Sequence, residues 1–446
     1  MTALKTVHLG SFDAEAFWRD PELASLPALP DQAGRRIVNA MDELLFLGCK
    51  AGDLLLTRFP MQAAFVDYLG QIGFAFEHNA DPLDSETIQE RQTSIFDILV
   101  NSSPEACELL AGVSLIAPYA IVPGTQEFCH KYSIPFDGPS LAAVVKANSK
   151  AISHQMAVDL GLKNFGCLVG SSSELVEQGM RTLADGPLII KDLFGVSGKG
   201  SLVVQSESML KRIGAHLAAQ EKKGKRVSLL IEPFLAMKLD FSCQIRIEPA
   251  GQVQFLGLQQ MHNHQLAYHG SSRLDAEQAE MLEQVGYFRQ MEELAAYLYR
   301  DGYWGDVCID SMQLEDGNVV PVVEINARES MGLLNYHLDQ LFAHEGIRSY
   351  FTFLSVGHRG PLDFGNLLGI LDPAGLLFTC KGARGILPLS ANALTINLNQ
   401  PSPTLSASPM RKGRFYFSIL AHPEERQVWL KSLRDAFQDF GFTLYS

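Results

Sequence analysis

A predicted hairpin that gathers two acids and an amide constrains this chain most. The segment from Asp310 to Arg328 reads D-S-M-Q-L-E-D-G-N-V-V-P-V-V-E-I-N-A-R, and an Asp-Gly turn separates its two apolar strands. Side chains alternate along a strand, so Glu324 and Asn326 share one face. An odd loop centred on Gly317 places Asp310 opposite Glu324, with Cβ atoms about 5 Å apart. An even loop would turn Asp310 to the other face.

This hairpin predicts a magnesium site. Asp310, Glu324 and Asn326 offer carboxylate and amide oxygens, which Mg²⁺ prefers and shares with nucleotide phosphates. The alternative is an acidic, exposed strand end. Arg328 follows directly and favours the functional interpretation, because an arginine beside a metal can stabilise charge on a transferring phosphoryl group.

A second motif predicts a phosphate-binding loop. From Pro187 to Gly200 the chain reads P-L-I-I-K-D-L-F-G-V-S-G-K-G, an apolar strand that ends in a lysine and a basic glycine loop. Glycines let backbone amides turn toward phosphate oxygens. The spacing fits neither the P-loop nor the dinucleotide fingerprint, and a plain hairpin turn is the alternative. The candidate phosphate contacts are Lys191, Gly195, Ser197, Gly198, Lys199 and Gly200.

Lys150 is a further candidate phosphate contact. A helix is predicted to begin near Ser149, and a cation in the first turn opposes the helix dipole. The position makes better sense if an anion lies at the helix start. A solvated lysine that tolerates the small penalty is the alternative.

The segment Glu232-Pro233-Phe234-Leu235 predicts a hinge that receives adenine, because an apolar strand ends there and the hinge can offer peptide groups and apolar side chains to the base. The next strand begins at Asp240 and alternates apolar with polar residues as far as Ile247. Arg246 is expected on its polar face, either solvated or in contact with phosphate and substrate.

Three histidines, His262, His264 and His269, could form a transition-metal site. No carboxylate or cysteine completes a compact ligand set nearby, so we expect a polar, substrate-facing loop instead. A single amphipathic helix is predicted from Ala276 to Tyr299, with its apolar stripe in the core.

Composition narrows the class of protein. The chain has 446 residues and a net charge of −14, which is unfavourable for a broad basic face that would hold duplex nucleic acid. We expect no membrane span, no signal peptide and a cytoplasmic location. The seven cysteines are widely separated and never in C-x-x-C spacing, so we expect reduced thiols.

Taken in order, these motifs resemble the ATP-grasp superfamily over roughly residues 146–330. The resemblance implies an α/β (α+β) protein with a pre-ATP-grasp α/β domain at 1–145, a small lid subdomain at 146–231, a larger antiparallel core subdomain with the metal site at 232–360, and a C-terminal α/β appendage at 361–446. It also implies that Lys150, Lys191 and Gly195 to Gly200 contact the ATP phosphates, that Glu232, Phe234 and Leu235 receive adenine, that Asp240 takes the ribose hydroxyls where many relatives have Glu, and that Asp310, Glu324 and Asn326 bind Mg²⁺, with Mn²⁺ as a substitute.

Within the superfamily, the chain looks like the pheganomycin-type peptide ligases and the butirosin-type ligases that load amino acids on a carrier protein. The similarity lies in the opening N-A-M-D-E-L-L-F-L-G-C-K-A-G-D-L-L-L, in N-S-K-A-I-S-H-Q-M-A-V-D-L-G-L, and in the tail with G-I-L-P-L-S and R-F-Y-F-S-I-L-A. In the tail, Lys381 and Arg384 are candidates for holding a carboxylate or the acceptor, with surface solvation as the alternative.

The resemblance implies a ligase that joins a carboxylate, from an amino acid or peptide, to an amine through an acyl phosphate, releasing ADP and phosphate. Arg328, Lys191, Lys199 and Arg246 are then the candidate catalytic residues. Two alternatives remain: aminoacylation of a carrier-protein thiol, and a regulatory protein that binds ATP without turnover. The expected partners are small molecules, with a carrier protein and a homodimer both left open and neither nucleic acid nor membrane expected.

Overall fold

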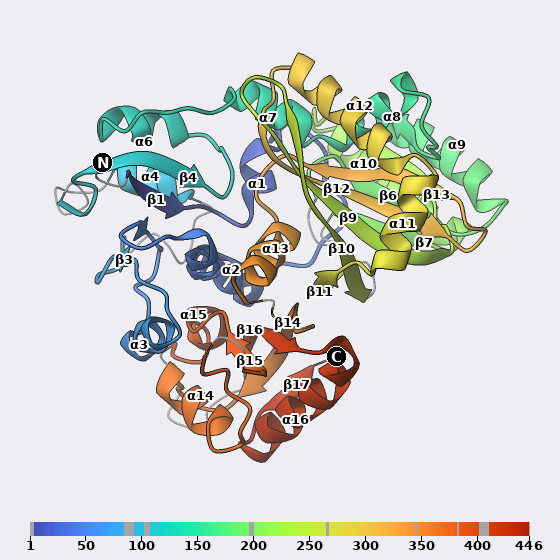
Figure 1. The fold of residues 1–446 in the computed structure, drawn as a ribbon. Coiled ribbons are helices and arrows are strands. Elements are labelled where there is room, and N and C mark those ends of the chain that lie inside the picture. Colours follow the sequence, from blue (N-terminus) through green and yellow to red (C-terminus); the bar gives the residue numbers. More distant parts are fainter. Residues whose placement is uncertain are drawn as a thin grey trace.

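The computed structural model describes residues 4–83, 93–101, 108–195, 200–264, 267–342, 344, 346–380, 383–400 and 410–445. Within these residues the chain forms two four-stranded sheets and a nine-stranded sheet. Figure 1 shows the sheet of β1 to β4 on the left, the other four-stranded sheet and most of the nine-stranded sheet on the right, and the C-terminal elements below. No helix in the described ranges is both long enough and apolar enough to cross a membrane.

The N-terminal part is an α/β layer built on a parallel sheet. Its strands run in the order β3-β2-β1-β4, and apolar side chains such as Val7, Leu9 and Leu54 are fully buried, as expected for parallel strands covered on both faces. The elements are β1 (Lys5–Leu9), α1 (Ala14–Trp18), α2 (Gln32–Asn39), η1 (Met41–Gly48), β2 (Leu54–Leu55), α3 (Ala63–Gln71), β3 (Glu77–His78), α4 (Ile95–Asn101), β4 (Val113–Pro118) and α6 (Thr125–Lys131).

The lid subdomain is a small antiparallel sheet covered by two helices, with an apolar core of its own. Its strands run in the order β5-β8-β6-β7. Ser171 caps the first helix by accepting a hydrogen bond from the Glu174 amide at 3.1 Å, as the S-x-x-E pattern predicts. The elements are β5 (Cys167–Val169), α9 (Ser172–Leu183), β6 (Leu188–Asp192), β7 (Ser201–Val204), α10 (Glu207–Glu221) and β8 (Leu229–Pro233).

The large sheet carries the metal hairpin at one edge and continues into the C-terminal part. Its strands run β13-β12-β9-β10-β11-β14-β16-β15, and β17 pairs with β14. They are β9 (Met237–Ile247), β10 (Val253–His264), β11 (Ala267–Arg273), β12 (Gly305–Leu314), β13 (Val319–Asn326), β14 (Arg348–His358), β15 (Gly385–Pro388), β16 (Arg411–Ala421) and β17 (Thr443–Tyr445). The sheet continues past residue 360, and the bounds of the four predicted domains stay predictions.

The remaining helices flank the core sheet and the C-terminal strands. They are α7 (Leu141–Ala147), α8 (Lys150–Asp159), α11 (Ala276–Gln284), α12 (Tyr287–Arg300), α13 (Met331–Phe342), α14 (Phe364–Leu371), α15 (Asn392–Thr395), η2 (Pro423–Glu425) and α16 (Arg426–Asp439). The prediction of a single helix from Ala276 to Tyr299 was wrong. Gly286 adopts φ +76° and ends the first helix, because glycine enters the left-handed region without a Cβ clash.

The polar face of β9 is not solvated along its whole length. Ser242 and Gln244 are buried, and the Ser330 hydroxyl at the start of α13 donates to Gln244 Oε1 at 2.8 Å. Polar side chains on this strand therefore line an interior between the sheet and α13, where they satisfy one another by hydrogen bonds.

Candidate active site

The acidic hairpin has the pairing that the sequence predicts. Asp310 on β12 lies directly opposite Glu324 on β13, and Cys308 lies opposite Asn326. The reason given for this register was wrong. The turn is centred one residue earlier than Gly317, because the Leu314 amide donates to the Asn318 carbonyl at 2.8 Å. An irregularity in pairing between Asp310 and Met312 then shifts the register back, as a β-bulge does.

Burial and neighbouring acids dominate the electrostatics of this hairpin. Burial raises the pKa of Asp310 to about 7, with further contributions from the Glu324 and Asp240 carboxylates. The Asn326 amide donates to Asp310 Oδ2 at 3.0 Å. Lys150 Nζ lies 2.8 Å from Glu324 Oε1 and supplies a positive charge on that side.

This donor set fits a hard divalent cation. Asp310 and Glu324 are neighbouring carboxylates, and a bound cation would offset the burial and the Glu324 charge that raise the pKa of Asp310. Oxygen ligands of this kind suit Mg²⁺ or Mn²⁺. The Asn326 carbonyl oxygen accepts from Arg328 Nη2 at 3.1 Å, so its amide would have to reorient to join Asp310 and Glu324. Among the described residues, no group of three or more His, Cys, Asp and Glu side chains is placed to hold a metal.

Lys150 joins the metal strand to the base of the glycine loop. Its side chain is 3% exposed, and its ammonium donates to Gly195 O at 2.7 Å as well as to Glu324. Its backbone amide donates to Leu193 O at 3.1 Å. The alternative of a solvated surface lysine is therefore wrong, and the first turn of α8 brings this cation between Glu324 and Gly195.

Lys191 is also buried, at the end of β6. Its ammonium lies 2.5 Å from Glu232 Oε2 at the end of β8. The side chain therefore points to the hinge side of the lid sheet, which supports the interpretation that it faces a cleft. The pair holds Lys191 close to the segment predicted to receive adenine.

Both ends of the glycine loop are described, while Ser197, Gly198 and Lys199 lie outside the described residues. Gly200 has φ +84°, and a Cβ there would come 3.0 Å from Gly195 Cα and 3.2 Å from Asp192 Cβ. The Asp192 amide donates to Gly200 O at 2.7 Å. The loop base is therefore a tight turn that requires glycine at its last position.

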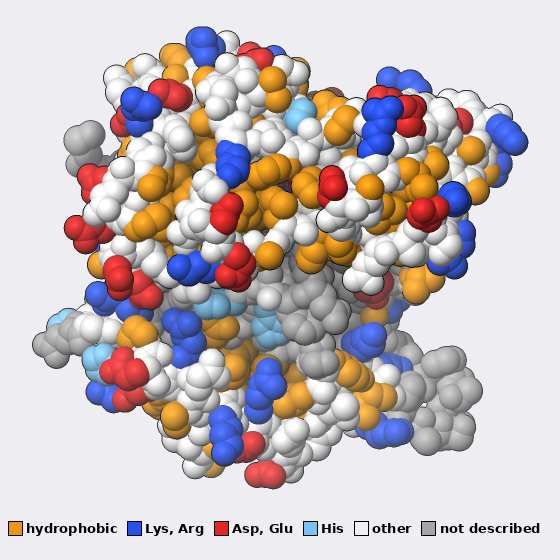
Figure 2. Space-filling view, turned by 90° about the vertical axis from the view of Figure 1, so that its right-hand side faces the viewer, with side chains coloured by type: hydrophobic (Ala, Val, Ile, Leu, Met, Phe, Trp, Pro, Cys, Tyr) orange, Lys and Arg blue, Asp and Glu red, His pale blue; other side chains and the backbone are white. Residues whose placement is uncertain are grey.

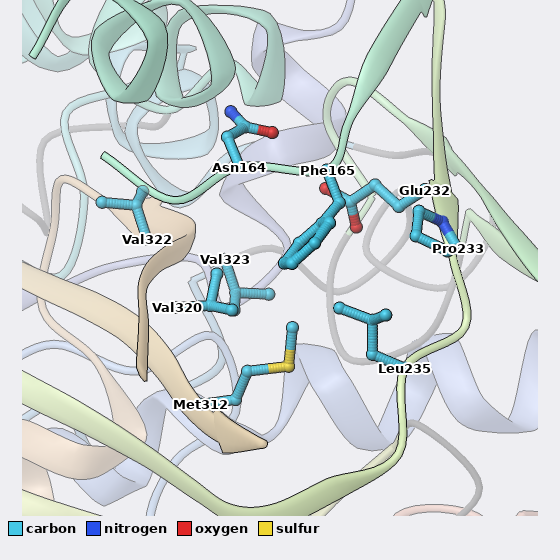
Figure 3. A pocket seen from close by; sticks show the side chains of 9 residues that line it. All are labelled: Asn164, Phe165, Glu232, Pro233, Leu235, Met312, Val320, Val322 and Val323. Carbon is cyan, nitrogen blue, oxygen red and sulfur yellow. The ribbon is translucent and has the colours of Figure 1, made fainter. Parts of the chain in front are cut away.

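A pocket lies beside the predicted hinge (Figure 3). Phe165 projects into it and faces Leu235 and Met312. The cavity has a volume of about 20 Å³, which is room for about one water molecule. A planar base would enter only if Phe165 and its neighbours moved apart. Its lining residues are Asn164, Phe165, Glu232, Pro233, Leu235, Met312, Val320, Val322 and Val323.

Phe234 does not take the place expected of it. Its side chain is 45% exposed and does not line the pocket. Its amide already donates to Pro187 O at 2.8 Å, so that group is not free for a base edge. Glu232 and Leu235 are the hinge residues that the structure brings to the pocket.

Asp240 lies near both cation and amide groups of the cleft. Burial raises its pKa to about 6, while the hydrogen bond from Asn263 and the charge of Lys191 act in the opposite direction. The Asn263 amide donates to Asp240 Oδ2. A carboxylate near Lys191 is compatible with the ribose role that the resemblance implies, and that role stays a prediction.

Arg328 is buried in a network between the core sheet and the N-terminal part. Its Nε donates to Glu15 Oε1 at 2.8 Å and its Nη1 to Tyr119 Oη at 3.1 Å. Arg328 also donates to Asn326, so the guanidinium connects β13 to Glu15 and Tyr119 of the N-terminal part. Arg246 instead forms a two-pronged ion pair with Asp306 at 2.7 and 2.8 Å, and its role in catalysis stays a prediction.

The histidines and the tail residues do not join this site in the described part of the chain. His262 Nε2 lies 3.0 Å from Ser272 Oγ, and burial lowers the pKa of His262 to about 4. His269 lies beside the Phe353 ring. Arg384 pairs with Glu425. The side chain of His264 and all of Lys381 lie outside the described residues.

Several residues of the site were not predicted from the sequence. Phe165 and Met312 line the pocket, Glu15 and Tyr119 hold Arg328, and Asn148 bonds both backbone groups of Ala327 at 2.9 and 3.2 Å. Asn148 is the one with a usable signal, because it directly precedes the predicted helix start at Ser149.

Comparisons with known proteins give the fold its relatives. No family model matches the chain. It is 23% identical over 351 residues to the [butirosin acyl-carrier protein]–L-glutamate ligase of Niallia circulans, covering 76% of each chain. N5-carboxyaminoimidazole synthase of Aspergillus clavatus, solved with ADP and its ribonucleotide, superimposes with a TM-score of 0.52 at 12% identity over 98% of this chain and 100% of that one.

The biotin carboxylase domain of the Hydrogenobacter thermophilus 2-oxoglutarate carboxylase, solved as a dimer with MgADP, also superimposes with a TM-score of 0.52, at 16% identity, over 100% of this chain and 91% of that one. These similarities show the fold of the chain, which is the ATP-grasp fold of these enzymes. The predicted ATP-grasp fold is confirmed, and the predictions of a ligase and of ATP and Mg²⁺ as cofactors agree with these relatives.

Proposed function

We propose that this ATP-grasp protein is a ligase that joins the carboxylate of an amino acid or peptide to an amine, with ADP and phosphate as products. The observation that carries the proposal is the position of Lys150. It bonds Glu324 of the metal hairpin at 2.8 Å and Gly195 of the glycine loop at 2.7 Å. One cation therefore lies where the predicted metal site and the predicted phosphate loop meet.

The residues divide the work by position. Asp310 and Glu324, with Asn326 after its amide reorients, would hold Mg²⁺, which would neutralise charge on the β and γ phosphates. Lys150 and Lys191 would bind phosphate oxygens from opposite sides of the cleft. The pocket around Phe165 and Leu235 would receive adenine.

The proposed reaction has two displacements. A carboxylate oxygen of the substrate attacks the γ phosphorus, the bond between that phosphorus and the β–γ bridging oxygen breaks, and ADP leaves. The amine nitrogen then attacks the acyl carbon of the acyl phosphate, the C–O bond to phosphate breaks, and the nitrogen loses a proton. Arg328 and the loop from Gly195 to Gly200 would stabilise the transferring group and exclude water.

One specific alternative to an amine acceptor is the thiol of a carrier protein. The Niallia circulans relative is named as a ligase that acts on an acyl-carrier protein, which favours a carrier-protein thiol as a second candidate acceptor.

On the face shown in Figure 2, basic side chains are mixed with acidic ones, so this face offers no broad basic field for nucleic acid. We also propose a homodimer as the state to test by light scattering, because the Hydrogenobacter structure is a dimer.

A single assay series separates the candidates. ADP formation is measured with Mg-ATP and each of the twenty amino acids, then with pairs of them, then with a carrier protein bearing its phosphopantetheine arm, and each product is weighed by mass spectrometry. ADP together with a dipeptide supports an amine acceptor, and ADP that depends on the carrier supports the thiol. Binding of Mg-ATP without ADP in any mixture would contradict the proposed ligase and favour a regulatory protein.

A further inference from the structure

We infer that the short helix α1 is a positioning element that holds the two halves of the nucleotide cleft at a fixed separation. Glu15 in α1 pairs with Arg328, which follows β13, and Arg19, directly after the last residue of α1, pairs with Asp192 at the base of the glycine loop. The expected effects on turnover rest on the proposed ligase function. The expected effects on the affinity for nucleotide require only that the protein binds nucleotide.

The first contact is the ion pair between Glu15 and Arg328. Both side chains are buried, and Glu15 Oε1 accepts from Arg328 Nε at 2.8 Å and from Arg328 Nη2. The same guanidinium donates to Asn326 Oδ1 at 3.1 Å, and Asn326 donates to Asp310 at 3.0 Å. A chain of hydrogen bonds therefore runs from α1 to the predicted metal ligands.

The second contact is the ion pair between Arg19 and Asp192. Arg19 Nη2 and Nε lie 2.9 and 3.0 Å from Asp192 Oδ2, and Nε lies 3.3 Å from Oδ1. Asp192 directly follows Lys191, and its amide closes the loop base on Gly200 at 2.7 Å. The forked guanidinium also donates to the carbonyl of Ala24 at 2.8 Å, which fixes its orientation.

Glu15 and Arg19, which make these two contacts, are one helical turn apart. The Arg19 amide donates to the Glu15 carbonyl at 3.1 Å, and residues at this spacing are neighbours on a helix surface, about 5–6 Å apart at Cβ. Trp18 Nε1 donates to Ile121 O at 2.9 Å, so the helix is also fixed to the N-terminal layer. Figure 1 shows α1 between that layer and the large sheet.

The chain after α1 continues onto the lid. The Ala24 amide donates to Arg226 O at 2.7 Å, and Ala24 and Leu26 are part of the lid's own core. A segment of the N-terminal part is thus built into the lid subdomain. Arg19 and Ala24 therefore tie this subdomain to the segment that carries Glu15.

The consequence is that α1 aligns Lys191 and Arg328 with each other. In the proposed function, Lys191 would bind the nucleotide and Arg328 would stabilise the transferring phosphoryl group. Loss of either ion pair would free α1 at one end, and both Lys191 and Arg328 would then be misaligned. Residues that act as one unit give non-additive effects when they are replaced together.

The test compares Arg19→Gln, Arg19→Lys, Glu15→Gln and the Glu15→Gln/Arg19→Gln double variant with the wild type. The matched control is Arg226→Gln, which breaks the exposed pair with Asp20 in the same segment. Calorimetry gives Kd for Mg-ADP, the ADP-release assay gives kcat and KM, and thermal unfolding shows that each variant is folded.

Arg19→Gln is expected to raise Kd for Mg-ADP and KM for ATP about tenfold, and Arg19→Lys about threefold, because lysine restores the charge without the fork. The double variant should have a kcat within about threefold of the slower single variant. Arg226→Gln should match the wild type.

A double variant whose loss equals the product of the two single losses would overturn the inference, as would an Arg19→Gln variant with unchanged Kd. If the wild type binds Mg-ADP but makes no product, the proposed function fails and the Kd values alone decide the role of α1.

Discussion

Asp310 and Glu324 lie directly opposite each other on β12 and β13, although the turn between them is centred on a different residue from the one that this pairing would require. The bulge near Ser311 makes up the difference. It places two carboxylates on one face at the end of the hairpin that meets Lys150, and this juxtaposition is what the proposed phosphoryl transfer depends on.

The first prediction concerns Glu324. Glu324→Gln should lower the rate of ADP release about a hundredfold or more, because it removes one charged oxygen ligand while keeping the shape of the side chain and a hydrogen-bond acceptor for Lys150. The control is Glu315→Gln, an exposed acid at the turn of the same hairpin, which should keep wild-type activity. Undiminished turnover in Glu324→Gln would remove this residue from the metal site.

The second prediction concerns Lys191. Lys191→Met should weaken binding of Mg-ATP about tenfold to a hundredfold, since a hydrogen bond to a charged group contributes about 1.5–3 kcal/mol. Calorimetric titration measures the change. Lys211→Met replaces a lysine of the lid that is paired on an exposed face of α10 and should bind as the wild type does. Equal affinities for the wild type and Lys191→Met would show that this ammonium does not reach the nucleotide.

The local parts of the site could be predicted from the sequence, and the long-range parts could not. The pairing of Asp310 with Glu324 follows from strand alternation and from a turn a few residues away. Even there the bulge left no signal, because a compensating change in the turn hides it. Lys150 and Lys191 were found from their places at a helix start and a strand end.

The contact between Glu15 and Arg328 joins residues 313 positions apart. Neither residue has a spacing or neighbour that indicates the other, so only the packing of the N-terminal layer against the core sheet reveals the pair. The same holds for Phe165 and Met312, which look like ordinary apolar residues until the fold places them in one pocket.

The third prediction concerns Gly200 in the loop base. Gly200→Ala should raise KM for ATP, because a Cβ there would lie 3.0 Å from the backbone of Gly195 and the loop must shift. The control is Gly224→Ala, whose φ of +88° is almost the same but whose surroundings hold no atom within 4 Å of a Cβ. Both variants should lose about 1–2 kcal/mol of unfolding free energy from the left-handed backbone.

Steady-state kinetics and urea unfolding separate the two effects. Only Gly200→Ala should change KM by more than about threefold. An equal change of KM in both glycine variants would mean that general loss of stability, and not the shape of the loop, governs ATP binding.

The last prediction concerns the pH dependence of stability at Asp42. This carboxylate is buried in η1 and accepts from the Arg58 amide at 2.6 Å, and burial raises its pKa to about 7. A raised pKa means that the folded protein holds the proton more tightly than the unfolded chain. The contribution to stability is therefore fully present below about pH 4 and is lost as pH rises toward 7.

Asp42→Asn keeps an acceptor for the Arg58 amide and cannot ionise, so it lacks this loss. The unfolding free energy of the variant relative to the wild type should increase by about 1–3 kcal/mol between pH 5 and pH 7.5. Urea unfolding of both proteins at pH 5, 6 and 7.5 measures the difference, in which the titration of all other groups cancels to first order. A difference that does not change with pH would show that Asp42 is ionised in the folded protein throughout this range, held charged by the Arg58 guanidinium nearby.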